Sequence, residues 1–204
     1  ASLEPISIAR GYTVFANGGY LVDPYFIDRI IDANGTVVFA TGPKVVCPDC
    51  STDIVPVEEP ESIQVTGEPS FRPLQLSAEE LEVVEQQSDE PEDMRAVATP
   101  APRVITEQNA YLVRSMMMDV VRRGTGVRAM KLGRKDLAGK TGTTNEQRDA
   151  WFSGYNDHLV TSVWVGFDNH EPLGRRELGG RAALPVWMEY MAVALEGAED
   201  KLPL

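Results

Sequence analysis

The chain has 204 residues, 43% of them hydrophobic, so it is long enough to bury one sizeable core and to form one or two domains. Its formal net charge of −12 disfavours binding to nucleic acid or to anionic lipid. No run of about eighteen apolar residues occurs, so the sequence predicts no membrane-spanning segment. Because of the negative charge, we expect no nucleic-acid partner.

A helix is predicted near the N-terminus, beginning at Pro5, which suits a first helical position. Apolar side chains recur at helical spacing through Ile8, Tyr12 and Phe15. The stretch Asn17-Gly18-Gly19 then supplies a left-handed stop, so the helix is expected to end just before it.

A β-hairpin is predicted next. Residues 26–31 and 36–39 are rich in side chains that favour strands. Asn34-Gly35 lies between them and is a strong signal for a two-residue turn. Together with the helix, this hairpin makes residues 1–41 the first ordered segment.

Residues 42–102 differ from the rest of the chain in charge and proline content. Between Pro43 and Pro102, fourteen Asp and Glu stand against three Lys and Arg, a balance of −11, which leaves −1 for the remainder. Prolines also recur through this stretch. Such a composition buries little apolar surface, so we predict a partly mobile surface insertion.

Cys47 and Cys50 form a Cys-Pro-Asp-Cys motif in this insertion, and three interpretations compete. A thioredoxin-like redox pair would need a strand-to-helix context, which the flanking prolines oppose. A zinc half-site would need two more ligands, and the only histidines, His158 and His170, are far away in sequence. A disulfide that staples an exposed loop suits an oxidising compartment. We expect no metal and no cofactor.

The second ordered segment, residues 103–197, opens with a predicted helix. Thr106 suits the N-cap and Gly124 the stop, so the helix should reach Arg123. Its predicted buried stripe consists of Val113, Met116, Met117, Val120 and Val121.

Three strands and a helix complete this segment. The strands are predicted at residues 136–144, 149–154 and 159–167. The helix is predicted to begin near Pro185 and to stop at Gly197, leaving residues 198–204 as a tail. The fold class is therefore α+β, an antiparallel sheet packed with helices.

The first of these strands carries Lys140-Thr141-Gly142-Thr143, a sequence suited to binding an extended peptide. Gly142 lacks a side chain, so a peptide backbone can lie along the strand and pair with it. Thr141 and Thr143 share one face, where two hydroxyls can bind a carboxylate. Lys140 projects to the other side, where it is expected to reach the floor of a cleft and attract an anionic substrate.

The backbone N–H of Thr143 could also stabilise an oxyanion formed when a serine attacks a carbonyl, given a second N–H donor. Losing one such donor usually costs about 3 to 4 kcal/mol in the transition state. These groups bind and stabilise, but none is a nucleophile. The 204 residues contain neither Ser-x-x-Lys nor Ser-x-Asn.

The motif strand and its surroundings resemble the third active-site motif of the penicillin-binding proteins and serine β-lactamases. More specifically, the chain resembles the C-terminal half of the transpeptidase domain of a class A (bifunctional) penicillin-binding protein of the 1A type. The resemblance covers about residues 1–41 and 103–197. The matching stretches are Ala9-Arg10-Gly11-Tyr12, Phe15-Ala16-Asn17-Gly18-Gly19, Gly124-Thr125-Gly126, Lys140-Thr141-Gly142-Thr143-Thr144, Trp151-Phe152 and Trp164-Val165-Gly166.

This resemblance implies a β-lactamase/transpeptidase-like fold, of which only the C-terminal part is present. It implies an enzyme at the periplasmic face of the bacterial inner membrane, held there by an N-terminal anchor, that cross-links peptidoglycan stem peptides and is acylated by β-lactams. In such enzymes a serine attacks D-Ala-D-Ala. A glycosyltransferase domain lies far upstream.

The resemblance also implies a role for each motif residue. Lys140 would organise the proton network, Thr141 and Thr143 would bind the substrate carboxylate, and the Thr143 N–H would complete the oxyanion hole. Gly142 would let the substrate approach. The nucleophile would belong to the N-terminal remainder of the same enzyme, which carries the Ser-x-x-Lys and Ser-x-Asn motifs.

Two alternatives stay open. A serine β-lactamase shares the motif strand, although the long acidic insertion and the Trp151-Phe152 strand do not suit one. A non-catalytic sensor or interaction domain could keep the cleft and lack the chemistry. The two enzymes differ in the fate of a penicillin, which stays attached to a transpeptidase and is rapidly released in hydrolysed form by a β-lactamase. A sensor would lack the upstream serine and lysine.

Overall fold

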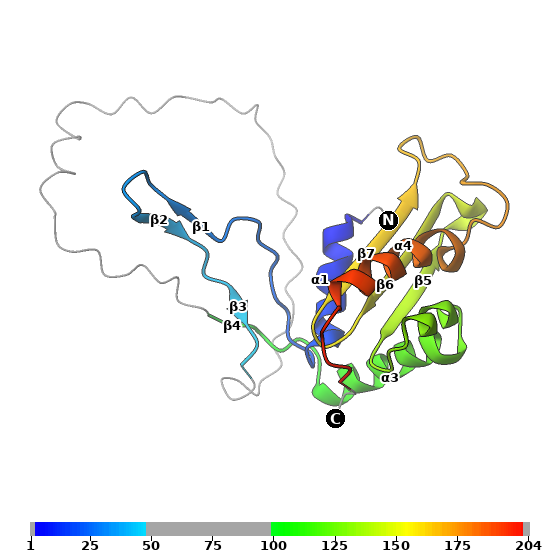
Figure 1. Cartoon of the computed structure of the whole chain (residues 1–204), viewed down its shortest axis with the longest axis horizontal. Coiled ribbons are helices and arrows are strands. Elements are labelled where there is room, and N and C mark those ends of the chain that lie inside the picture. The colour runs from blue at the N-terminus through cyan, green and yellow to red at the C-terminus, as the bar shows by residue number, and fades with distance from the viewer. Residues whose placement is uncertain (1–2, 48–98, 202–204) are drawn as a thin grey trace, which may run out of the picture. The chain divides into compact units, whose positions relative to one another are not determined.

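The computed structural model describes residues 3–47 and 99–201, which fall into two units. One unit contains residues 25–42, and the other contains the remaining described residues. In these two ranges no helix is both long enough and apolar enough to cross a membrane. Figure 1 labels the helices and strands.

The first helix, α1, spans Pro5–Ala16 with proline in its first turn, as predicted. The predicted left-handed stop is also confirmed, since Gly18 and Gly19 have φ of +80° and +105°. At Gly19 a Cβ would lie 2.3 Å from the backbone oxygen of Ile105. The chain can therefore return beside the end of α1 only because this residue is glycine.

Residues 25–42 form the predicted hairpin, in which β1 (Arg29–Ile31) pairs antiparallel with β2 (Val37–Ala40). The predicted two-residue turn is wrong. The N–H of Asp32 donates to Thr36 O at 2.9 Å, and the Asp32 carboxylate accepts from the N–H groups of Asn34 and Thr36 at 2.8 Å each. With Gly35 at φ +89°, the turn is a three-residue loop that the Asp32 carboxylate stabilises.

The two flanks of the acidic segment pair with each other. Strand β3 (Lys44–Val45) lies parallel to β4 (Thr99–Pro100), and the Ala101 N–H donates to Val45 O at 2.8 Å. The insertion was predicted over residues 42–102, of which residues 48–98 lie outside the described residues, so its mobility stays a prediction. Cys47 is disulfide-bonded. Cys50 also lies outside the described residues, so its pairing stays a prediction.

Helix α3 spans Glu107–Arg123, and Gly124 is its C-cap, as predicted. The Thr106 hydroxyl accepts from the Asn109 N–H at 3.2 Å, which confirms the N-cap. The predicted buried stripe is only partly right. Met116 is 62% exposed, and the buried residues of the helix are Ala110, Arg114, Met118 and Val121.

The shift in the stripe has a physical cause. Helix α3 contacts two separate apolar clusters, one through Met118 and the other through Val121. Arg114 can be one of the buried residues because its guanidinium pairs with the carboxylate of Asp157. A run of three methionines does not reveal which of them turns inward, because any of them can fill such a gap.

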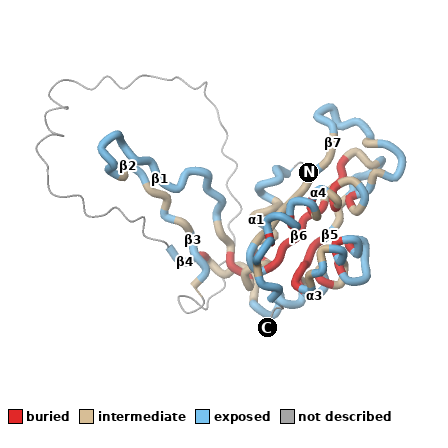
Figure 2. Tube along the Cα trace, in the orientation of Figure 1, coloured by how far each residue is buried: buried red, intermediate tan, exposed pale blue. Residues whose placement is uncertain are grey.

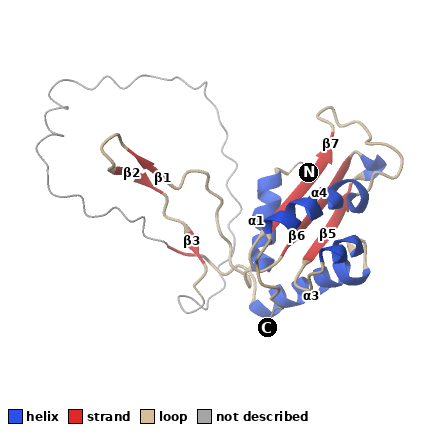
Figure 3. Ribbon diagram, viewed as in Figure 1, coloured by secondary structure: helices blue, strands red, loops and turns tan. Residues whose placement is uncertain are grey.

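The three predicted strands form one antiparallel sheet in the order β5-β6-β7 (Figure 3). Strand β5 spans Ala138–Thr143, β6 spans Asp149–Tyr155 and β7 spans Val160–Gly166. In this sheet Gly142 lies opposite Trp151, and Trp151 lies opposite Trp164. The α+β fold class is confirmed.

The two faces of the sheet carry different clusters. On one face Phe152 packs edge-on against Trp187 of helix α4 (Gly179–Ala194), with ring centroids 4.9 Å apart. On the other face Tyr155 packs against Tyr12 of α1, at 6.2 Å. Buried residues accordingly lie along most of β6, at the start of β5 and on parts of the helices (Figure 2).

Helix α4 spans Gly179–Ala194 and carries Pro185 in its interior, so the predicted start near Pro185 is wrong. Two consecutive glycines favour a loop by propensity alone. A Cβ at Gly179 would lie 2.2 Å from the carbonyl oxygen of Trp151 and 2.4 Å from that of Gly142. The close approach of the helix end to the sheet therefore selects glycine, which propensity cannot reveal.

Candidate functional site

The outer border of β5 is open along the motif. In an antiparallel pair, alternate residues direct their backbone groups toward the partner strand. The Thr144 N–H donates to Asp149 O at 3.1 Å, which places the even-numbered residues on the β6 side. The backbone groups of Thr141 and Thr143 therefore point outward. No strand within residues 3–47 and 99–201 pairs with this border.

Lys140 is exposed and lies at this same border. Its Nζ donates to the carbonyl oxygen of Thr141 at 2.7 Å and to the Thr141 hydroxyl at 3.4 Å. The side chain thus folds back along the strand instead of reaching a cleft floor, because the outward Thr141 carbonyl is an open acceptor. A positive charge lies beside the groups that an anionic peptide would meet.

The hydroxyls of Thr141 and Thr143 lie on one face of the strand, as alternation predicts. The Thr141 Oγ1 is 2.8 Å from the Oγ1 of Thr125, just after α3. The Thr143 Oγ1 accepts from the Gly179 N–H, at the start of α4, at 3.0 Å. Each hydroxyl therefore has a neighbour from another element.

Thr125 is a member of this group that the motif analysis did not assign. The only signal for it was the Gly124-Thr125-Gly126 stretch, which contributed to the family resemblance without a role. Its contact with Thr141 joins residues sixteen positions apart, and spacing does not predict such a contact.

Gly142 has a packing role in addition to its proposed one. A Cβ there would lie 3.1 Å from the Cβ of Trp151. Its carbonyl oxygen also lies under the start of α4. A side chain at position 142 would thus crowd Trp151 on the neighbouring strand.

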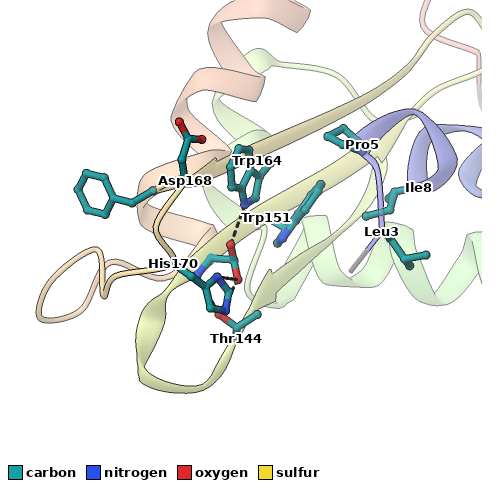
Figure 4. A pocket seen from close by; sticks show the side chains of 10 residues that line it. Leu3, Pro5, Ile8, Thr144, Trp151, Trp164, Asp168 and His170 are labelled. Atoms are coloured by element: carbon teal, nitrogen blue, oxygen red, sulfur yellow. Dashed lines mark hydrogen bonds and ion pairs between the residues drawn. The ribbon is translucent and has the colours of Figure 1, made fainter. Parts of the chain in front are cut away.

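A cavity of about 630 Å³ lies near the far end of the motif strand (Figure 4). Asp149 lines this cavity, and both oxygens of its carboxylate already have polar partners. The Trp164 Nε1–H donates to Asp149 Oδ1 at 2.9 Å, the Thr144 hydroxyl donates to Oδ2 at 3.2 Å, and His170 Nδ1 lies 3.7 Å from Oδ2. The other side chains that line it are Leu3, Pro5, Ile8, Trp151, Phe167 and Asp168. These polar contacts hold the loops after β5 and β7 together.

Among the residues that the structure describes, no serine nucleophile is evident beside Lys140. Ser153 lies directly opposite it on β6, but Ser153 is only 3% exposed and accepts from the Ser162 hydroxyl at 2.9 Å. A buried hydroxyl of this kind cannot reach a peptide bound along the border of β5. The described residues also hold no group of three or more His, Cys, Asp or Glu side chains suited to a metal ion.

This chain is similar to known proteins over most of its length. The family model described as "Penicillin binding protein transpeptidase domain" matches residues 2–174. Penicillin-binding protein 1A of Pseudomonas aeruginosa is 47% identical over 202 residues, covering 96% of this chain and 23% of the relative. Penicillin-binding protein 1A of Escherichia coli is 37% identical over 227 residues, covering 98% of this chain and 27% of the relative.

Solved structures give the same result. The crystal structure of penicillin-binding protein 1A from Haemophilus influenzae matches with a TM-score of 0.74 and 34% identity, covering 100% of this chain and 28% of that one. The imipenem acyl-enzyme complex of penicillin-binding protein A from M. tuberculosis matches with a TM-score of 0.52 and 16% identity, which supports the fold alone.

The chain thus spans about a quarter of the length of these relatives. The family match covers most of the chain, including Thr125 and the strand with the open border. The chain belongs to the penicillin-binding protein transpeptidase domain family, and its relatives are penicillin-binding proteins 1A.

Proposed function

We propose that this chain is part of a D-Ala-D-Ala transpeptidase. In this proposal it binds the terminal carboxylate of the substrate and stabilises the oxyanion that forms when the serine attacks the scissile carbonyl. The complete enzyme cross-links peptidoglycan stem peptides. The observation that carries this proposal is the open border of β5, where the backbone groups of Thr141 and Thr143 point away from β6. The family and the names of the relatives support it.

The proposed binding mode follows from this geometry. The stem peptide pairs with the border of β5 as an added strand, and its terminal carboxylate accepts from the threonine hydroxyls. The ammonium of Lys140 adds positive charge at the same border. The Thr143 N–H faces the scissile carbonyl oxygen and stabilises the negative charge that develops there.

The reaction itself needs a serine from outside these 204 residues. The serine oxygen attacks the carbonyl carbon, the peptide C–N bond breaks, and the serine proton passes to the leaving nitrogen, so that D-Ala departs as the free amine. An amine of a neighbouring stem peptide then attacks the acyl ester, which forms the cross-link and regenerates the serine. We assign this serine, with the Ser-x-x-Lys and Ser-x-Asn motifs, to the N-terminal remainder of the enzyme.

The relatives are about four times as long as this chain, and we propose that the complete enzyme is of similar length. It is bifunctional, with a glycosyltransferase domain upstream, and acts at the periplasmic face of the inner membrane. β-Lactams acylate the same serine because their carboxylate and ring carbonyl imitate D-Ala-D-Ala. The alternatives of a serine β-lactamase or a non-catalytic sensor are less well supported, because the relatives are named as penicillin-binding proteins.

Labelling of the full-length protein with a fluorescent penicillin tests this function. We expect a covalent adduct that persists through repeated washing, on a serine of a Ser-x-x-Lys motif N-terminal to this chain. Release of hydrolysed penicillin within seconds would identify a β-lactamase. A complete lack of labelling would identify a sensor.

Thr143→Val tests the role of the motif strand, because valine keeps the backbone N–H and removes only the hydroxyl. We expect acylation by carboxylate-bearing β-lactams to slow by about tenfold to a hundredfold, the usual cost of one hydrogen bond to a charged group. Second-order acylation rate constants of the full-length enzyme measure this effect. The matched control is Thr161→Val, whose hydroxyl contacts the Met191 sulfur and not the border of β5. Equal rates for both variants would rule out the carboxylate role.

A further inference from the structure

The Gly124-Thr125-Gly126 stretch holds Thr125 in a fixed position beside β5. The N–H groups of Gly124 and Gly126 both donate to the carbonyl oxygen of Val120, at 3.0 Å each. A Cβ at Gly126 would lie 3.4 Å from the Phe152 ring, and one at Gly180 would lie 3.0 Å from the carbonyl oxygen of Thr125. The backbone around Thr125 is therefore confined by α3, by the core and by the start of α4.

The Thr125 hydroxyl has one hydroxyl partner at this position, the Oγ1 of Thr141 at 2.8 Å. Either hydroxyl could donate, and the direction decides which hydrogen is left for a ligand. The ammonium of Lys140 is a donor only, and it already donates to Thr141 Oγ1 at 3.4 Å. When Thr125 also donates, the hydrogen of Thr141 is free to bind an anion.

Thr143 is oriented in the same way by a different element. Its Oγ1 accepts from the Gly179 N–H at 3.0 Å, so the threonine hydrogen remains available as a donor. Thr143 therefore keeps one hydrogen for a ligand, and Thr141 keeps one as well when Thr125 donates to it. Hydrogen bonds linked in this sequence strengthen one another, because each donor polarises the next.

We propose that Thr125 is a positioning residue of the carboxylate site, which acts by donating to Thr141 and turning the Thr141 hydrogen toward the ligand. The site then consists of three hydroxyls, two from β5 and one from the turn after α3, with Thr125 behind the two that touch the carboxylate. This inference rests on the proposed function of the β5 border, and it adds a residue that the motif does not contain.

Thr125→Val in the full-length enzyme tests the inference, with two probes: a penicillin with a free carboxylate and its methyl ester. We expect the acylation rate constant for the carboxylate form to fall by about threefold to tenfold, the effect of one neutral hydrogen bond. The rate constant for the ester should change far less, because the ester carries no negative charge. Thr125→Ser keeps the hydroxyl and should restore the rate for the carboxylate form.

The outcomes separate this inference from the proposed function. The key quantity is the acylation rate constant for the carboxylate form divided by that for the ester. If Thr143→Val slows acylation but Thr125→Val leaves this ratio at the wild-type value, Thr125 has no positioning role. Equal losses with both probes that Thr125→Ser does not restore would assign Thr125 to structure alone. If the wild-type enzyme forms no adduct with either probe, the proposed function itself fails.

Discussion

Asp136 shows how a single buried charge is accommodated beside the motif strand. Its side chain is fully buried, and Arg134 donates to both carboxylate oxygens, at 2.9 and 2.7 Å. The Asn156 amide donates to Oδ2 at 3.1 Å. Burial raises the pKa of Asp136, but the hydrogen bonds from Arg134 and Asn156 outweigh burial and leave that pKa below its usual value.

This pKa shift predicts a pH dependence of stability. Because the folded protein holds the Asp136 carboxylate charged, the ion pair stabilises the fold above the unfolded pKa of about 4. The contribution is lost as the pH falls through the lower, folded pKa. We expect the free energy of unfolding, measured with urea between about pH 6 and pH 2.5, to fall toward acid.

The Asp136→Asn variant provides the comparison for this measurement. It lacks the carboxylate, so its stability at neutral pH should be lower and its decline toward acid shallower than that of the wild type. If the two decline in parallel, groups other than Asp136 determine the acid sensitivity.

At the scale of the elements, the start of α4 positions the site. The Gly179 N–H holds the Thr143 hydroxyl, and it can do so only because the helix end lies against the backbone of β5 and β6. The absence of a Cβ at Gly179 permits this approach. Two elements distant in sequence therefore meet at the strand that binds the ligand in our proposal.

Gly179→Ala should displace this helix end, since the new Cβ would lie 2.2 Å from the Trp151 carbonyl oxygen. We expect a loss of about 1 to 3 kcal/mol in the free energy of unfolding, typical of overpacking. Slower penicillin acylation should accompany it. Gly11→Ala is the matched control, because nothing lies within 4 Å of its Cβ in helix α1.

Alanine at position 11 should stabilise the protein by about 0.5 to 1 kcal/mol, since it improves an exposed helical site. Thermal unfolding of the two variants gives the comparison. If the Gly179→Ala protein were as stable and as reactive as the wild type, the close contact between α4 and the sheet would not contribute to stability or to acylation.

At the scale of the whole molecule, the two described flanks of the acidic segment lie side by side. Strands β3 and β4 pair with each other, so the chain on either side of residues 48–98 is held together. All fourteen acidic residues between Pro43 and Pro102 lie, in sequence, between these two paired strands.

Replacing residues 51–97 by a Gly/Ser linker of about ten residues should leave acylation within about twofold of the wild-type rate. The paired strands remain, and closure of a loop costs little more for a long loop than for a short one. Acylation rate constants and the thermal unfolding midpoint measure the outcome. Loss of folding in this variant would show that the replaced residues stabilise the transpeptidase fold.

Elements with a local signal were predictable from the sequence. Helix α1, the Thr106 cap of α3 and the three strands follow from spacing, capping residues and β-forming side chains. The inward face of α3 and the start of α4 were not predictable. Both depend on packing partners, namely the two clusters that α3 joins and the strand backbone beneath Gly179.

The candidate site divides in the same way. Alternation along a strand is a local property, so the shared face of Thr141 and Thr143 could be deduced from residue order. The return of the Lys140 ammonium to the strand, and the contacts of Thr125 and Gly179 with the motif hydroxyls, join residues that folding alone brings together. Hydrogen-bond partners across elements depend on distances that no residue pattern encodes, and so they required the folded chain.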